Sequence, residues 1–140
     1  MNGRRYLLDT NAIIALLQND FNLLPLLSDA EWIGISIISQ IEFLAFPNLT
    51  QADRRLFQQF IQRVEVIDLC SRDNLAIEQI IFIRQQYRFK LPDAIITATA
   101  IQNSATLITR DAQLNRVTEL TVLDWSERPR RKTTGLPLTS

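Results

Sequence analysis

The sequence contains no histidine, so the most common general base and metal ligand of proteins is missing. Its single cysteine, Cys70, excludes an internal disulfide, and without histidine the usual zinc sites are excluded as well. We interpret Cys70 as a small core residue that follows a strand. Any chemistry that this chain performs must therefore depend largely on oxygen atoms.

Long apolar runs are also missing. No run reaches the roughly 18 residues that a membrane-spanning helix needs, and an acid interrupts the N-terminal stretch where a signal peptide stays apolar. These features predict a cytoplasmic protein without membrane contact. The 140 residues are 46% hydrophobic, which fits one compact domain with a substantial core. We expect this domain to cover residues 1–125, followed by a flexible basic tail at 126–140.

The net charge is zero, with 15 basic and 15 acidic side chains, which argues against a protein that coats nucleic acid through bulk charge. Three arginines nevertheless gather in "RPRRK" at 128–132. Arginine suits phosphate contacts, so this segment is a candidate nucleic-acid contact. The alternative, which its composition favours, is a solvated and disordered tail.

Short runs rich in Val, Ile and Leu alternate with longer helical patterns along the chain. The expected strands cover residues 5–9, 32–36, 64–68, 105–109 and 120–124. Strands that alternate with helices indicate an α/β fold with a parallel sheet covered on both faces. A three-layer α/β/α sandwich is the expected architecture.

The helix boundaries carry recognisable signals. Thr50 is a good N-cap for a helix that begins at residue 51, and Ser71 or Asp73 begins the helix over 74–89. Pro92 fits the first turn of a helix that runs to about Asn103. The 74–89 helix carries more apolar side chains than one buried stripe needs. Self-association through this helix and complete burial between the sheet and a neighbouring helix are both consistent with this pattern.

Four acids from distant segments are expected to meet at one edge of the sheet. Asp9 and Asp111 follow the first and fourth strands, and ligands of parallel sheets gather at the carboxyl ends of strands. Crossover helices begin at the same edge. Asp93 lies in the first turn of its helix, and we place Glu42 early in the helix that follows the second strand.

Each acid alone also has a structural explanation. Asp93 gains a modest electrostatic benefit at a helix N-terminus, Asp9 can cap the helix that follows it, and Asp111 can cap a turn. Glu42 is harder to explain in this way, because apolar residues surround it in the sequence. Two carboxylates about 4 Å apart repel by roughly 4 kcal/mol at an effective dielectric near 20, so the cluster needs a counter-cation.

A hard divalent cation is the natural counter-ion for such a cluster. Mg²⁺ and Mn²⁺ accept carboxylate-only sites and retain open positions for water and phosphate oxygens. Ions bound in this way support phosphodiester hydrolysis without any help from histidine. The absence of histidine is therefore compatible with an enzyme that acts on phosphodiesters.

Four segments of the chain resemble the signature segments of PIN-domain ribonucleases, specifically the small VapC-type toxins of toxin–antitoxin pairs. These segments are "LLDTNAII" at 7–14, "SQIEFLA" at 39–45, "LPDAIITATA" at 91–100 and "LITRD" at 107–111. The resemblance covers about residues 5–125. It implies a PIN-like α/β/α sandwich with a central five-stranded parallel sheet in the order 3-2-1-4-5.

The resemblance also implies specific roles and partners. It makes the Mg²⁺ or Mn²⁺ site, which is also the catalytic site, out of Asp9, Glu42, Asp93 and Asp111. Candidate supporting residues are Thr10, Asn11 and Thr109, and Arg110 is a candidate RNA contact. The implied activity is that of an endoribonuclease, in which a metal-activated water hydrolyses single-stranded or looped RNA. The implied partner is a VapB-like antitoxin. The surplus apolar side chains of the 74–89 helix, independently of the resemblance, favour a second copy of the chain as a further partner.

Two other functions are consistent with parts of this pattern. A haloacid-dehalogenase-type phosphatase also begins with an Asp after its first strand, but it requires a second acid where this chain has Asn11. It also needs a positioned lysine, and the chain has only Lys90 and Lys132. The remaining alternative is a noncatalytic PIN-like module that binds RNA or an antitoxin in the same groove.

Overall fold

The computed structural model of the chain describes residues 4–127. Its strands are β1 (Arg4–Leu8), β2 (Ala30–Ser36), β3 (Glu65–Ile67), β4 (Thr106–Ile108) and β5 (Val122–Leu123). Its α-helices are α1 (Thr10–Leu17), α2 (Leu23–Leu27), α3 (Ile37–Leu44), α4 (Gln51–Ile61), α5 (Asn74–Tyr87) and α6 (Leu91–Gln102). Two short 3₁₀ helices follow, η1 (Ala112–Arg116) and η2 (Trp125–Glu127). The "RPRRK" segment and the rest of the expected tail from residue 128 lie outside the described residues.

The five strands form one sheet in the order β3-β2-β1-β4-β5, and every neighbouring pair is parallel. The predicted fold class and strand order are thus confirmed. All strands point the same way, so their carboxyl ends meet at one edge, which we call the carboxyl edge. Because β1 is the central strand and pairs with both β2 and β4, the end of β1 lies in the middle of this edge.

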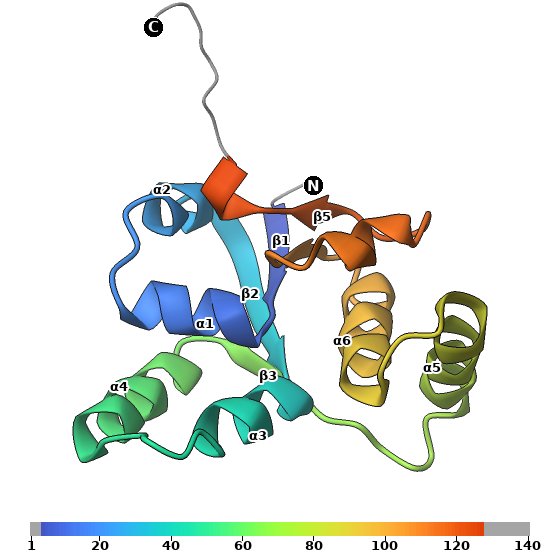
Figure 1. Ribbon diagram of the computed structural model, residues 1–140, viewed down its shortest axis with the longest axis horizontal. Helices are drawn as coiled ribbons and strands as arrows, with labels where there is room; N and C mark the ends of the chain where they lie inside the picture. The colour runs from blue at the N-terminus through green and yellow to red at the C-terminus, as the bar shows by residue number, and fades with distance from the viewer. Residues whose placement is uncertain (1–3, 128–140) are drawn as a thin grey trace, which may run out of the picture.

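Helices cover both faces of the sheet, as Figure 1 shows, with α5 and α6 on one side and α1, α2 and α4 on the other. The alternation of side chains along β1 explains these two layers. Leu7 packs into the cluster with α5 and α6, whereas Tyr6 and Leu8 pack into the cluster on the opposite face. Both faces of a central parallel strand are therefore buried, as its continuous apolar run predicts.

The predicted helix starts are confirmed in detail. Thr50 caps α4 by accepting a hydrogen bond from the Asp53 amide, while Asp53 accepts one from the Thr50 amide, which forms a capping box. Asp73, one of the two predicted candidates, caps α5 through the Ala76 amide. Pro92 lies in the first turn of α6. Local sequence signals thus fix where the helices begin relative to the sheet.

The outer side of α5 is exposed in residues 4–127. Ile80 and Ile83 are buried on the side that packs with α6, whereas Leu75 is 84% exposed and Phe82 is 53% exposed. The expectation that α5 is buried on all sides is therefore wrong for these outer side chains. Self-association through this surface stays a prediction.

Cys70 is exposed, so its interpretation as a core residue is wrong. The strand ends earlier than expected, at Ile67, and Cys70 lies in the loop that leads to α5. At the other end of the domain, Trp125 is buried and begins η2, which includes the first two residues of the expected tail. Within the described part of the chain, no helix has the length and apolarity needed to cross a bilayer.

Candidate active site

Asp9 is fixed at the carboxyl edge by both its backbone and its side chain. Leu8 and Ile108 are paired at the ends of β1 and β4, and the Asp9 amide donates to the Ile108 carbonyl at 3.2 Å. One carboxylate oxygen, Oδ1, accepts the Ala12 amide at 3.0 Å and so caps α1, while the Thr109 hydroxyl donates to Oδ2. The capping role expected for Asp9 is confirmed, in a buried position at the middle of the edge.

Asp111 is held beside Asp9 through Thr109. The Asp111 amide donates to Thr109 Oγ1 at 3.1 Å, and this same hydroxyl donates to the Asp9 carboxylate. Asp111 Oδ1 accepts the Gln113 amide at 3.0 Å, so Asp111 caps η1 as the expected turn cap. Thr109 therefore connects the ends of β1 and β4 by holding the Asp9 carboxylate and the Asp111 backbone amide, and its supporting role stays a prediction.

Glu42 reaches the site from α3, although not from the position expected. Ser36 caps α3 directly at the end of β2, so the helix spans Ile37–Leu44 and Glu42 lies near its C-terminal end, not early in it. Its Oε1 accepts the Thr10 hydroxyl at 2.6 Å. This bond joins α3 to the first residue of α1 and positions the carboxylate.

Asp93 comes from the first turn of α6. This helix is largely buried because small and apolar residues pack it against the sheet and α5. They are Ala94, Ile95, Ile96, Thr97, Ala98 and Ala100. Close packing of the helix against the sheet brings Asp93 to the rim above the strand ends.

The four predicted acids line a single open pocket of about 460 Å³. Its lining is Asp9, Thr10, Asn11, Glu42, Ala45, Phe46, Asp93, Ile96 and Asp111. Four segments far apart in the sequence thus contribute one acid each to the same hollow. The sequence reasoning did not single out Phe46, although an aromatic residue so close to Glu42 was an available signal.

Arg110 does not line this pocket. Its guanidinium lies 5.3 Å from the centre of the Trp125 ring, a distance suited to a cation–π contact. Its side chain is thus packed against η2, and the RNA contact suggested for it stays a prediction.

The electrostatics of the pocket disfavour ionised carboxylates. Burial raises the pKa of Asp9 to about 6 and outweighs the hydrogen bonds from Thr109, Ala12 and Asn11, which lower this pKa, while the Asp111 carboxylate adds the smallest increase. Burial also raises the pKa of Asp93, the neighbouring Asp111 and Glu42 carboxylates raise it further, and Lys90 opposes them. Both pKa values are thus raised mainly because burial removes water from the carboxylate, and neighbouring negative charge adds to this effect.

The donor set fits a hard divalent cation. All the charged side chains that line the pocket are carboxylates. Each carboxylate oxygen can accept more than one partner, so the capping bonds of Asp9 and Asp111 leave acceptor capacity. Within residues 4–127, no group of three or more acidic or cysteine side chains is arranged closely enough to hold a metal ion as it stands. The pocket thus brings the four carboxylates into one hollow, and those of Asp9, Glu42 and Asp111 are engaged by backbone amides or hydroxyl groups.

Comparisons with known proteins identify the family to which this fold belongs. The family model described as the PIN domain matches residues 6–120. No curated protein sequence matches the chain. Among solved structures, a chain from a toxin–antitoxin complex of Klebsiella pneumoniae is 26% identical, with a TM-score of 0.71, and the match covers 86% of this chain and 97% of that one.

Two further structures extend the comparison. A chain of VapBC-1 from nontypeable Haemophilus influenzae is 25% identical with a TM-score of 0.69, and 88% of this chain and 99% of that chain are covered. A chain in a structure of FitAB bound to a DNA fragment shares the fold at 21% identity, with a TM-score of 0.72 over 91% of this chain and 99% of that one. The predicted resemblance to VapC-type proteins is confirmed, and since the family model spans most of its length, the chain belongs to the PIN domain family.

Proposed function

We propose that this protein is a Mg²⁺- or Mn²⁺-dependent endoribonuclease that hydrolyses RNA phosphodiester bonds. The observation that carries the proposal is the convergence of Asp9, Glu42, Asp93 and Asp111 on one pocket. PIN domains are generally nucleases, which supports the same class of reaction. The preferred substrate is single-stranded or looped RNA, and the expected products carry 5′-phosphate and 3′-hydroxyl ends.

In this reaction the acids of the pocket and the two threonines beside them would have separate roles. The four carboxylates would hold the cation, and its positive charge would offset the burial and the repulsion that raise the pKa of Asp9 and Asp93. Thr109 holds the Asp9 carboxylate and Thr10 holds the Glu42 carboxylate, so two of the ligands are oriented in advance. When bound, Mg²⁺ or Mn²⁺ supplies an activated water and stabilises the charge that develops on the phosphodiester.

We further propose that the protein is the toxin of a toxin–antitoxin pair, with a VapB-like antitoxin as its partner. The similarity to chains from structures named as toxin–antitoxin and VapBC complexes supports this assignment. The antitoxin would cover the open acidic pocket and so block access of RNA. Co-expression with the product of a neighbouring gene, followed by a cleavage assay, would test whether such a partner suppresses the activity.

A homodimer is the expected free form. The apolar side chains on the outer side of α5 are exposed, and a second copy of the same surface would bury them. Sedimentation at high micromolar concentration should show a dimer that Phe82→Glu converts to a monomer. A wild-type monomer under these conditions would remove the dimer from the account.

The nuclease is tested by incubating the antitoxin-free protein with a structured RNA pool and mapping the ends. We expect cleavage in Mg²⁺ or Mn²⁺, none in EDTA, and at least a hundredfold loss in Asp93→Asn, as is common when a catalytic electrostatic group is removed. Asp73→Asn is the matched control, because Asp73 caps α5 away from the pocket. Binding of RNA without metal-dependent cleavage by the folded wild type would support the noncatalytic binding module instead.

A further inference from the structure

A second hollow adjoins the acidic pocket and shares one wall with it. This hollow has a volume of about 290 Å³ and is lined by Ile14, Gln18, Phe43, Phe46, Pro47, Asn48, Leu49 and Asp53. Phe46 lines both hollows and so forms part of the wall that they share. The volume lies at the lower end for ligand pockets, which suits one small planar group. We call this hollow the side pocket.

The aromatic wall of the side pocket is fixed in place. Phe43 is buried and stacks on Phe57, with ring centres 4.7 Å apart and planes 15° apart. Phe46 meets Phe43 edge-on at 6.1 Å, yet it is 41% exposed. The exposed ring is thus supported from below by a buried pair, and its free surface is available to a flat partner.

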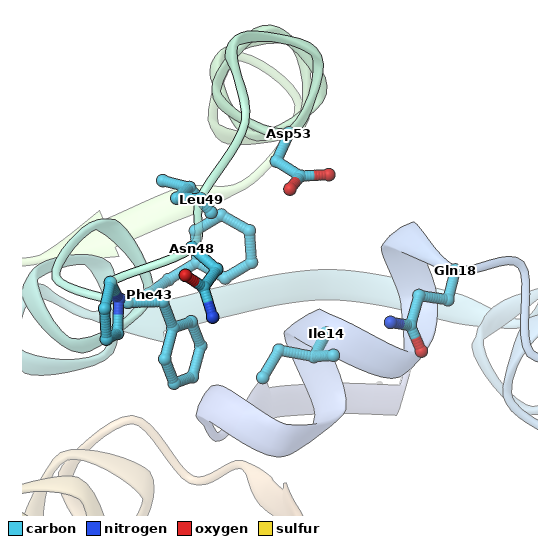
Figure 2. A pocket seen from close by; sticks show the side chains of 8 residues that line it. Ile14, Gln18, Phe43, Asn48, Leu49 and Asp53 are labelled. Carbon is cyan, nitrogen blue, oxygen red and sulfur yellow. The ribbon is translucent and has the colours of Figure 1, made fainter.

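The polar groups of the side pocket come from two other elements. The segment from Phe46 to Leu49 is a turn closed by the Leu49 amide on the Phe46 carbonyl, with Pro47 at the position where turns favour proline, and this turn presents Asn48. Gln18 lies at the end of α1. Figure 2 shows Asn48 and Gln18 on opposite sides of the hollow, with their amide groups turned toward it.

These polar groups retain hydrogen-bonding capacity. Among the hydrogen bonds within residues 4–127, none involves the side-chain amide of Gln18 or Asn48, and Asp53 uses Oδ2 for its cap and leaves Oδ1. An apolar hollow with an aromatic wall and a few amide groups combines stacking with edge recognition, which is how proteins hold an unpaired nucleobase. A helix or a bulky side chain would not use the two amides.

We propose that the side pocket holds one unpaired nucleobase of the RNA strand, next to the phosphodiester that is cleaved in the acidic pocket. The proposal rests on the proposed nuclease function and names the part of the protein that selects the cleavage site. Phe46 stacks on the base, and the shared wall places that base beside the acids. Asn48 and Gln18 bind the edge of the base.

The chemistry of the lining also predicts which base is preferred. Amide side chains match adenine, which offers one acceptor and one amino donor side by side. A carboxylate accepts from N–H groups, and the exocyclic amino groups of adenine and cytosine each offer two hydrogens, whereas uracil offers only its single ring N–H. Uracil presents no amino group to Asp53. The side pocket should therefore prefer adenine or cytosine over uracil at one position next to the cut.

The test uses a short single-stranded RNA that carries 2-aminopurine at successive positions, bound in Mg²⁺ to the Asp93→Asn protein so that it remains intact. Stacking on an aromatic ring quenches the fluorescence of 2-aminopurine. We expect the fluorescence to be quenched at one position of the RNA. When Phe46→Ala is combined with Asp93→Asn, this quenching should be lost and the RNA affinity should become about fivefold to a hundredfold weaker. Phe21→Ala is the matched control, because Phe21 is 83% exposed and lines neither hollow. Asn48→Ala and Gln18→Ala should reduce the preference for adenine or cytosine over uracil.

The outcomes separate this proposal from the nuclease assignment. Metal-dependent cleavage by the wild type together with unchanged quenching and affinity in Phe46→Ala would overturn the nucleobase pocket and leave the nuclease intact. Quenching that depends on Phe46, in a protein that cleaves no RNA, would support the pocket and reject the nuclease. If Phe46→Ala binds an apolar peptide more weakly than the wild type does but binds RNA equally well, the side pocket serves a protein partner and the proposal is overturned.

Discussion

Asp9 and Asp73 have the same local role in this chain, yet they lie in very different surroundings. Each precedes a helix and accepts a backbone amide in its first turn, that of Ala12 for Asp9 and that of Ala76 for Asp73. Asp73 is exposed, whereas Asp9 is buried at the carboxyl edge with Asp111 beside it. The comparison shows that a capping signal fixes a local conformation, while the convergence of distant segments makes a site.

The difference has an energetic consequence. At the isolated cap of α5, the carboxylate is hydrated and contributes only the ordinary capping stabilisation. In the acidic pocket, burial and neighbouring acids oppose ionisation, so the folded protein without a cation carries a cost. Functional sites commonly hold such unfavourable charge, because a ligand removes the cost when it binds.

The largest expected effect on stability follows from Asp9→Asn. The folded-state pKa of Asp9, about 6, exceeds the ordinary aspartate value of 3.8. The stabilisation from this group is therefore complete below pH 3.8 and is lost as pH rises through 6. In metal-free buffer at pH 7.5 the variant should be more stable than the wild type by roughly 2–3 kcal/mol, at 1.36 kcal/mol per unit of pKa. At pH 3.5 this gain should vanish. Urea unfolding at both pH values measures it.

Asp73→Asn is the control for Asp9→Asn, since it changes a capping acid outside the pocket in the same way. A gain in Asp9→Asn that is equal at both pH values would contradict the assignment of the effect to a buried charge.

A smaller effect is expected from Thr10→Val, which removes the hydroxyl that donates to Glu42 at 2.6 Å. Loss of a group that orients a metal ligand typically lowers metal affinity or activity by about 10- to 100-fold. Thr10→Ser keeps the hydroxyl and should therefore keep most of the wild-type metal affinity and activity. Mn²⁺ affinity and the RNA cleavage rate, measured side by side, test the effect. Equal behaviour of the Ser and Val variants would show that the hydroxyl does not position Glu42.

The smallest effect is expected from removing Asp73, the N-cap of α5. Asp73→Ala should cost about 1 kcal/mol of unfolding free energy, because the Ala76 amide loses its partner at the start of α5. RNA cleavage measured well below the melting temperature should be unchanged. A large loss of cleavage in this folded variant would mean that the two capping acids do not differ in function as described.

The sequence predicted the fold well because its signals are local. Thr50, Asp73 and Pro92 begin their helices as expected, and the apolar runs mark the five strands. The order of the strands came from the resemblance of motifs, because pairing between distant strands is not encoded in any one segment. Convergence of the four acids followed once the strand ends were placed at one edge.

The details that escaped prediction depend on tertiary packing or on exact boundaries. β3 ends at Ile67, so Cys70 lies in a loop, and Ser36 begins α3 at once, so Glu42 comes late in that helix. The contact of Arg110 with Trp125 joins two elements that no periodic pattern connects. The side pocket was missed because it forms only where the turn around Asn48 faces α1.

The most direct measurement of the central claim is a calorimetric titration of Mn²⁺ into the wild type, Glu42→Gln, Asp93→Asn and Asp73→Asn. The account predicts saturable binding by the wild type and binding at least tenfold weaker in the first two variants, which remove ligands contributed by α3 and α6. It predicts wild-type affinity in Asp73→Asn. Mn²⁺ binding that is insensitive to both Glu42→Gln and Asp93→Asn would show that the four acids do not form one cation site and would contradict the account.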